Sequence, residues 1–304
     1  PIARTVVPPA AAKLIPRCTE EEMYSLLTED LAEAARLLPD TRNAEKARVT
    51  GIAAYTLLAK VYLTFGKHAE ARTALDEAMK ATGYGLESTT KRVFDINNKM
   101  NKEVIFALYY NKTNDNGHGY WYSANTDVMA DIRNPTPEFK AIYDESDNRL
   151  ALIDTYTKIQ SNLFAMTKWY DTYDATYTTQ VGNDFPHLRY ADITLMYAEA
   201  LAETDLPTAL TWLNKTRIRA GLDELTSNDV KTKAEFIREL AAERGREFAL
   251  EGHRWFDLVR LGLAVEHFRN LGYTLDAHNL IFPIPQNQIE IVNNPSILWQ
   301  NPGF

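Results

Sequence analysis

Charged side chains of both signs alternate along one stretch near the C-terminal third of the chain, which reads RELAAERGREFALEGHRWFDLVR over 238–260. A carboxylate and an imidazole two residues apart, Glu251 and His253, could serve as a general acid and base. However, the stretch supplies no nucleophile and no metal ligand set. Opposite charges three and four residues apart are typical of structural ion pairs on a helix. We therefore predict no catalytic residues here and an ion-pair network instead.

The spacing of this stretch predicts one long helix over 234–259. Arg244 and Glu251 fall on the same 3.6-residue line as Phe248 and Trp255, so they share the helix face with apolar side chains. Because a buried charge is costly unless it is paired, we predict that Arg244 and Glu251 both have ionic partners, drawn from other helices.

The sequence contains no pattern typical of nucleic-acid binding or of metal binding. The net charge is -8 and no basic run stands out, which argues against nucleic acid as a partner. Histidines stand at 68, 118, 187, 253, 267 and 278 without a paired spacing, so the sequence predicts no metal site and no cofactor. The stretch 144–149 lacks the glycine of a calcium-binding EF-hand loop. Cys18, the single cysteine, reads as an ordinary thiol, and no segment is long and apolar enough to span a membrane.

The remaining pattern indicates a mainly α-helical scaffold with long irregular loops and little β-structure. Residues 1–18 are Pro-rich and predicted to be extended, and Thr19 with Glu22 has the spacing of a helix capping box. Apolar and small residues at helical spacing predict helices over 46–65 and 68–82, joined by a glycine turn like a tetratricopeptide unit. A second such pair is predicted over 188–221. Between the pairs, 83–187 is loop-rich, with a possible strand over 104–110.

Four ordered segments resemble the SusD/RagB family. They are the charged helix AERGREFALEGHRWFDLVR at 242–260, the segment LRYADITLMYAEA at 188–200, the stretch 214–222 ending in RAGL, and the pair FPIPQ at 282–286 with QNPGF at 300–304. The helix pair at 46–82 fits the family's tetratricopeptide core. The resemblance covers essentially the whole chain and implies a single SusD-like domain over 1–304. It also implies that an N-terminal part of the full protein is missing.

The resemblance implies a nutrient-binding lipoprotein that is not an enzyme. Such proteins lie on the extracellular face of the outer membrane of Bacteroidetes, where they bind a glycan or a peptide and pass it to a SusC-like TonB-dependent transporter. The membrane contact would be a lipid anchor outside this chain. On this reading the helices are rigid support and the region 83–187 faces the ligand.

Sugar binding requires aromatic faces for the apolar side of the ring and amide or carboxylate partners for its hydroxyls. One stretch offers both, and it supplies the predicted ligand residues: Asn114, Asp115, Asn116, Tyr120, Trp121, Tyr122 and Asn125. A second aromatic cluster runs from Trp169 to Tyr177, with core packing as its alternative explanation.

Two other functions remain open at this point. A tetratricopeptide adaptor that binds protein tails would explain the two helix pairs but not the C-terminal segments. A glycoside hydrolase would need two carboxylates facing each other across a cleft, and no spacing in the sequence selects such a pair.

Overall fold

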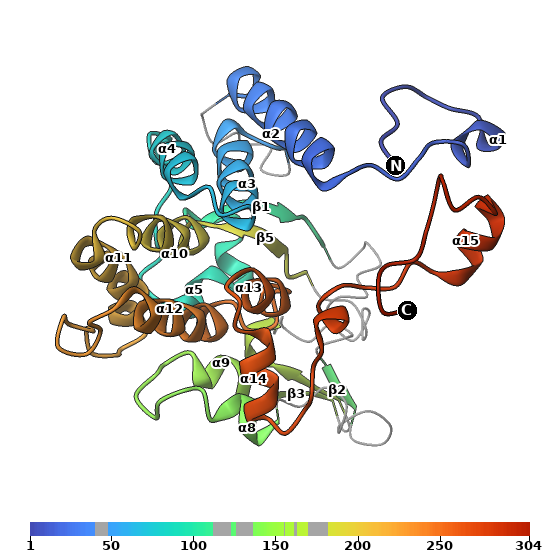
Figure 1. Ribbon diagram of the computed structural model, residues 1–304. Helices are drawn as coiled ribbons and strands as arrows, with labels where there is room; N and C mark the ends of the chain where they lie inside the picture. The colour runs from blue at the N-terminus through green and yellow to red at the C-terminus, as the bar shows by residue number, and fades with distance from the viewer. Residues whose placement is uncertain (40–47, 112–122, 126–135, 155, 161–162, 170–181) are drawn as a thin grey trace. The chain divides into compact units, whose positions relative to one another are not determined.

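The computed structural model describes residues 1–39, 48–111, 123–125, 136–154, 156–160, 163–169 and 182–304. Within these, the chain forms two compact units, one of residues 1–30 with 255–304 and one of residues 31–254. The larger unit carries the helical scaffold (Figure 1). No helix in the described part of the chain has both the length and the apolar character needed to cross a bilayer. The predicted mainly α fold is confirmed.

Two antiparallel helix pairs form the centre of the larger unit. The first joins α3 (Gly51–Thr64) to α4 (His68–Ala78), and the second joins α10 (Tyr190–Leu201) to α11 (Leu206–Arg219). Gly66 turns the first pair at φ 68°, a left-handed conformation that glycine adopts without steric cost. The first pair is shorter than predicted, since α3 begins at Gly51 and not at 46, and α4 ends at Ala78 and not at 82; in the second pair, 188 and 189 belong to a strand.

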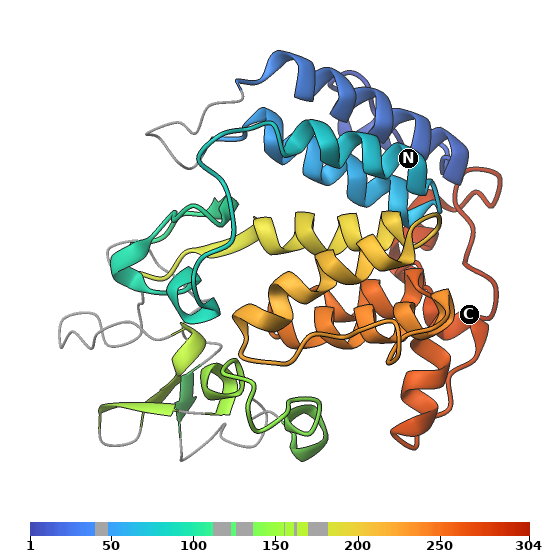
Figure 2. The same cartoon turned by 90° about the vertical axis from the view of Figure 1, so that its left-hand side faces the viewer.

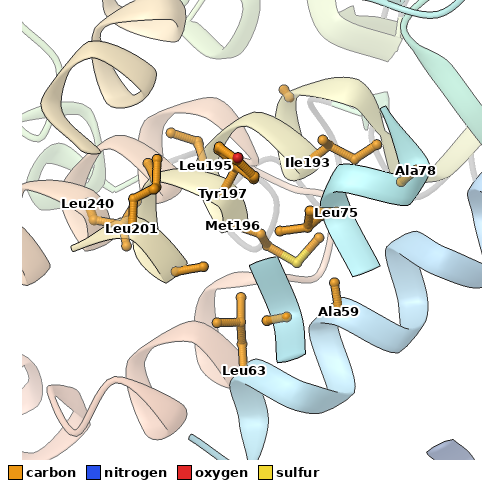
Figure 3. Packing of buried hydrophobic residues seen from close by; sticks show 14 of the residues in the cluster. Ala59, Leu63, Leu75, Ala78, Ile193, Leu195, Met196, Tyr197, Leu201 and Leu240 are labelled. Carbon is orange, nitrogen blue, oxygen red and sulfur yellow. The ribbon is translucent and has the colours of Figure 1, made fainter. Parts of the chain in front are cut away.

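Small side chains bring these helices close together. The alanines at 53, 54, 59, 71, 74 and 78 are all buried, and their small side chains leave room for the larger side chains of the same core between the helices. Helix α12 (Lys233–Glu247) packs against both α10 and α11 (Figure 2). Figure 3 shows side chains of three helices facing one another: Ala59 and Leu63 of α3, Leu75 and Ala78 of α4, and Ile193 and Met196 of α10.

Two small sheets lie in the region between the helix pairs. Strand β1 (Val104–Leu108) pairs antiparallel with β5 (Phe185–Arg189), and β2 (Ser123–Asn125), β4 (Leu163–Met166) and β3 (Tyr156–Gln160) form the second sheet in that order. The predicted strand over 104–110 is therefore present as β1. Short helices complete the region: α5 (Thr90–Val93), η1 (Ile96–Asn98), α8 (Pro137–Lys140), α9 (Leu150–Asp154) and η2 (Thr167–Trp169).

The single helix predicted over 234–259 is wrong. Helix α12 ends at Glu247, Leu250 and Gly252 take positive φ values of 63° and 84°, and α13 (Arg254–Arg260) begins after them. In a continuous helix the carbonyls of residues 247 and 249 would accept from the backbone N–H groups of residues 251 and 253. Here Arg189 Nη2 and Lys168 Nζ donate to them instead, at 3.1 and 2.5 Å. Buried cations from distant segments replace the helical hydrogen bonds.

The smaller unit contains α1 (Pro9–Ala12), the start of α2 (Glu20–Leu37), α14 (Ala264–Asn270), η3 (Ala277–Leu280) and α15 (Gln286–Val292). The capping box is confirmed, since Thr19 and Glu22 each accept from the other's backbone N–H. The N-terminal segment, predicted to be extended, contains one helical turn, because Pro9 at the first helical position is already fixed in a helical φ.

Candidate functional site

The last residue of β5, Arg189, is the centre of a buried ion network. Its side chain is 1% exposed and donates to Glu103 Oε1 at 2.6 Å, to Glu247 Oε1 at 2.9 Å and to Glu251 Oε2 at 2.7 Å. Glu103 immediately precedes β1, whereas the two other carboxylates come from the end of α12 and the turn after it. One guanidinium therefore fixes the β1–β5 sheet to the helical scaffold.

The network extends across the larger unit and is balanced in charge. Arg149 bonds Asp147, Glu243 and Glu247, and Arg219 bonds Glu103 and Glu247. Among the described residues, the network contains five cations, Arg149, Lys168, Arg189, Arg219 and Arg246, and five carboxylates, Glu103, Asp147, Glu243, Glu247 and Glu251. Equal numbers of each sign leave no net charge to be buried, which is the condition under which such a cluster is tolerated.

Titration behaviour supports a structural role for the network. Burial acts to raise the pKa of Glu247, but the positive charges of Arg219, Arg189 and Arg149 outweigh it and hold that pKa below its usual value. Burial likewise acts against ionised Glu251, and Arg189 with Lys168 again lower its pKa. These carboxylates are charged at neutral pH and fully engaged by cations.

Arg244 and Glu251 both have ionic partners, as predicted, but the partners of Glu251 come from strand β5 and the 3-10 helix η2 and not from another α-helix. Arg244 Nη1 lies 2.8 Å from Asp192 of α10, whose carboxylate also meets Lys60 of α3 at 2.5 Å. Glu251 accepts from Lys168 and Arg189. Thus one residue of α10 ties α3 to α12, across the two predicted helix pairs.

Glu251 and His253 are not arranged as an acid–base pair. Both oxygens of Glu251 accept hydrogen bonds from cations. Burial lowers the pKa of His253 to about 4, and its ring stacks on Phe248 with centroids 4.6 Å apart. General acid–base catalysis near neutral pH favours groups that titrate close to that pH. Neither side chain meets this condition.

Within the loop-rich region, one ammonium group joins residue 110 to residue 184. Lys99 Nζ donates to the carbonyl of Tyr110 at 2.5 Å and pairs with Asp184 Oδ1 at 2.8 Å. The backbone N–H of Tyr110 donates to the same oxygen at 3.0 Å. Residues 110 and 184 follow β1 and precede β5, so the chain between them starts and ends at a single clamp. Lys99, Tyr109 and Asp184 were not among the predicted site residues, although the Tyr109-Tyr110 doublet was visible at the end of the predicted strand.

Most predicted ligand residues cannot be placed. Asn114, Asp115, Asn116, Tyr120, Trp121 and Tyr122 lie outside the described residues. Asn125 ends β2, where it is paired with Leu163 of β4. The proposed role of this stretch therefore stays a prediction.

The first aromatic residue of the second cluster belongs to the core. Trp169 is 1% exposed, packs edge-on against Phe94 at 5.1 Å and stacks on Phe185 at 5.6 Å. Tyr170, Tyr173 and Tyr177 lie outside the described residues. For Trp169, core packing is the correct reading, because its ring has no face open to a ligand.

The part of the chain that holds most of the ion network matches a known protein family in sequence. A sequence model of the SusD family matches residues 147–304, more than half of the chain. The chain belongs to the SusD family. The matched residues include every member of the ion network described above except Glu103.

Relatives of this SusD-family chain are longer than it is. SusD-like protein P2 of Formosa agariphila is 27% identical over 95% of this chain and 66% of its own length, so the chain spans about two thirds of that relative. A SusD superfamily protein structure from Bacteroides vulgatus has a TM-score of 0.78 and 24% identity, covering 95% of this chain and 70% of that one. Surface glycan-binding protein A from Bacteroides thetaiotaomicron in complex with laminarihexaose has a TM-score of 0.73 and 19% identity, covering 94% and 72%. These structures share the fold.

Two other SusD-like segments form amide clips. Asn214 donates to the carbonyl of Leu225 and accepts from its N–H, at 2.8 and 2.9 Å. Gln300 does the same to Ile284, at 2.9 and 2.8 Å. The second clip joins the FPIPQ segment to the QNPGF segment. Gln300 therefore ties the two C-terminal segments together within one unit.

Proposed function

We propose that this chain belongs to a non-enzymatic, cell-surface nutrient-binding protein that binds a glycan and delivers it to a SusC-like TonB-dependent transporter. On this proposal the protein lies on the extracellular face of the outer membrane, held by a lipid anchor outside the chain. Membership of the SusD family is the observation that carries the proposal. The similarity in fold to a surface glycan-binding protein crystallised with laminarihexaose supports a glycan as the ligand.

The arrangement of charges supports binding without turnover. Glu251 of the charged stretch 242–260 is paired with buried cations, whereas the loop-rich region carries aromatic and amide groups. Aromatic faces with amide partners bind a sugar ring without needing a poised acid and base. The region 83–187 is thus the proposed ligand-facing part, with Asn114 to Asn125 as its proposed contact stretch.

The direct test is a binding screen on the purified full-length protein. Neutral hexasaccharides, among them laminarihexaose, cellohexaose, xylohexaose and maltohexaose, would be compared with a peptide library by calorimetry. Binding of one glycan without release of reducing sugar supports the proposal. Binding of peptides alone would favour an adaptor, and release of reducing sugar would favour a glycoside hydrolase.

The contact stretch and the transporter need separate tests. Replacing Trp121 with Ala is expected to weaken glycan binding about tenfold or more, since aromatic contacts commonly dominate binding energy. Unchanged affinity would remove this stretch from the site. Co-purification of a TonB-dependent transporter from outer membranes, and protease accessibility on intact cells, would test delivery and location. Recovery from the cytoplasmic fraction would contradict the proposed location.

A further inference from the structure

An exposed tyrosine is adjacent in the chain to the clamp formed by Lys99, Tyr110 and Asp184. Tyr109 follows β1, and its side chain is 52% exposed. Lys99 Nζ lies 4.1 Å from the centroid of its ring, in a cation–π contact that holds the ring in place. The ammonium is itself fixed by Asp184 and the Tyr110 carbonyl. The tyrosine is therefore about half exposed while its ring contacts an ammonium that is itself held in place.

The other end of the clamp has an unused acceptor. The side chain of Asp184 is 9% exposed, and Oδ1 takes both the Lys99 ion pair and the Tyr110 N–H. Its second oxygen, Oδ2, is buried and has no hydrogen-bond partner within the described part of the chain. A buried carboxylate oxygen without a donor is unfavourable, because it has given up its hydrogen bonds to water without replacing them. Its place beside an exposed ring points to a donor supplied by a ligand.

A small cavity lies next to this carboxylate. Its volume is about 20 Å³, and Asp184, Lys99 and Asp95 are among its lining residues. That space holds one water molecule or a group the size of a hydroxyl. Two larger cavities, of about 670 and 450 Å³, lie in the smaller unit, but no aromatic side chain lines either of them. Of these three cavities in the described part of the chain, the small one combines an acceptor, Asp184, with the neighbouring contact between Lys99 and Tyr109.

Local backbone strain marks the same place. Met100, next to Lys99, has a φ of 49°, which is uncommon for a residue other than glycine. Asn101 stabilises this turn by donating to the carbonyls of Val93 and Asn98 and by accepting from the N–H of Glu103. Strained backbone that is held by its surroundings is found at ligand-binding sites. The turn sets the position from which Lys99 reaches the clamp.

We propose that Tyr109 and Asp184 form a subsite for one pyranose ring of a neutral glycan. The apolar face of the sugar stacks on Tyr109, and a hydroxyl donates to Asp184 Oδ2, directly or through a water in the cavity. Neutral sugars fit because Asp184 and Asp95 outnumber the single cation Lys99 at the cavity, which disfavours a carboxylated sugar. This subsite rests on the proposed glycan-binding function and adds described residues outside the stretch Asn114 to Asn125.

The test uses calorimetric titration of the full-length protein with laminarihexaose and the other neutral hexasaccharides, and with an oligogalacturonate as the anionic probe. Tyr109→Ala is expected to weaken binding at least about tenfold, whereas Tyr109→Phe retains the ring and stays within about twofold. Asp184→Asn is expected to weaken it about tenfold. Tyr273→Ala, which removes a 63% exposed tyrosine of the other unit, is the matched control and leaves affinity unchanged.

The outcomes separate this inference from the function on which it rests. If the unaltered protein binds no glycan, the proposed function fails. If it binds a neutral glycan and Tyr109→Ala binds equally well, the function stands and the subsite is wrong. Equal losses in Tyr109→Ala and Tyr109→Phe would overturn the stacking contact, and wild-type affinity in Asp184→Asn would overturn the part of the carboxylate. Binding of the anionic probe alone would overturn the choice of a neutral sugar.

Discussion

Glu251→Gln tests whether the buried ion network stabilises the scaffold. The substitution keeps the shape of the side chain but removes one negative charge from a cluster that is otherwise balanced. Glu251 Oε1 accepts from Lys168 and Arg189 at 2.8 and 2.9 Å, and Oε2 accepts from Arg189 at 2.7 Å. The glutamine amide can replace one oxygen but turns its NH₂ group towards a cation at the other.

The expected loss of stability follows from this geometry. Removing one partner of a buried ion pair destabilises a protein by about 3–5 kcal/mol. Burial already lowers the pKa of Lys168 in spite of the neighbouring Glu251. Without that carboxylate the pKa falls further, and loss of the lysine proton limits the cost, at about 1.4 kcal/mol per pKa unit. At about 2 °C per kcal/mol for a chain of this size, we expect Tm to fall by about 6–10 °C.

Thermal and urea unfolding followed by circular dichroism measure this change. Glu145→Gln, at an exposed position of the same unit, is the control and should stay within about 1 °C. Adding Lys168→Met to Glu251→Gln removes one charge of each sign, so the double variant should lose less stability than the sum of the two single variants. A Tm for Glu251→Gln within 2 °C of the unaltered protein would refute the reasoning. Loss of a turnover activity at unchanged Tm would restore the catalytic reading.

Two further predictions concern the same scaffold. Gly221→Ala should lower the free energy of unfolding by about 1–2 kcal/mol in urea titrations, because φ is 85° there and the added Cβ would lie 3.2 Å from the carbonyl oxygen of Ser146. Gly85→Ala is the control, because that glycine has open space around it and no positive φ. Equal losses of stability in the two variants would contradict this account. Acid should lower the stability of the fold, because the pKa values of Glu243, Glu247 and Glu251 are lower in the folded state than in the unfolded chain. Below about pH 4.5 the unfolded chain therefore binds more protons than the folded one, and stability falls as the pH drops through the folded pKa values. Unfolding free energies that are equal at pH 5 and pH 3 would show that these carboxylates do not contribute.

The helical scaffold could be predicted because its signal is local. Apolar and small residues recur at helical spacing in each pair, so the helices and their buried faces followed from neighbouring residues alone. The prediction failed where distant groups intervened. The charged stretch over 234–259 has helical periodicity throughout, yet the helix ends at Glu247, where Arg189 and Lys168 donate to the carbonyls of Glu247 and Ala249. Periodicity contains no information about which distant cation will reach a carbonyl.

The candidate site was less accessible to sequence reasoning for the same reason. The aromatic and amide stretch from Asn114 to Asn125 could be recognised from composition, because its residue types are adjacent in the chain. The clamp could not be recognised in this way. Tyr110 and Asp184 are 74 residues apart, and their proximity depends on the antiparallel pairing of β1 with β5.

From the residues alone we could infer the family, the mainly helical fold and the need for Arg244 and Glu251 to be paired. The pairing follows because burying an unpaired charge is prohibitively costly. Only the three-dimensional structure identifies the ionic partners of the buried charges. Arg149 reaches Glu243 across 94 residues, Arg189 reaches Glu103 across 86, and Lys168 reaches Glu251 across 83. Electrostatic pairing acts through space, so sequence spacing could require these partners but could not identify them.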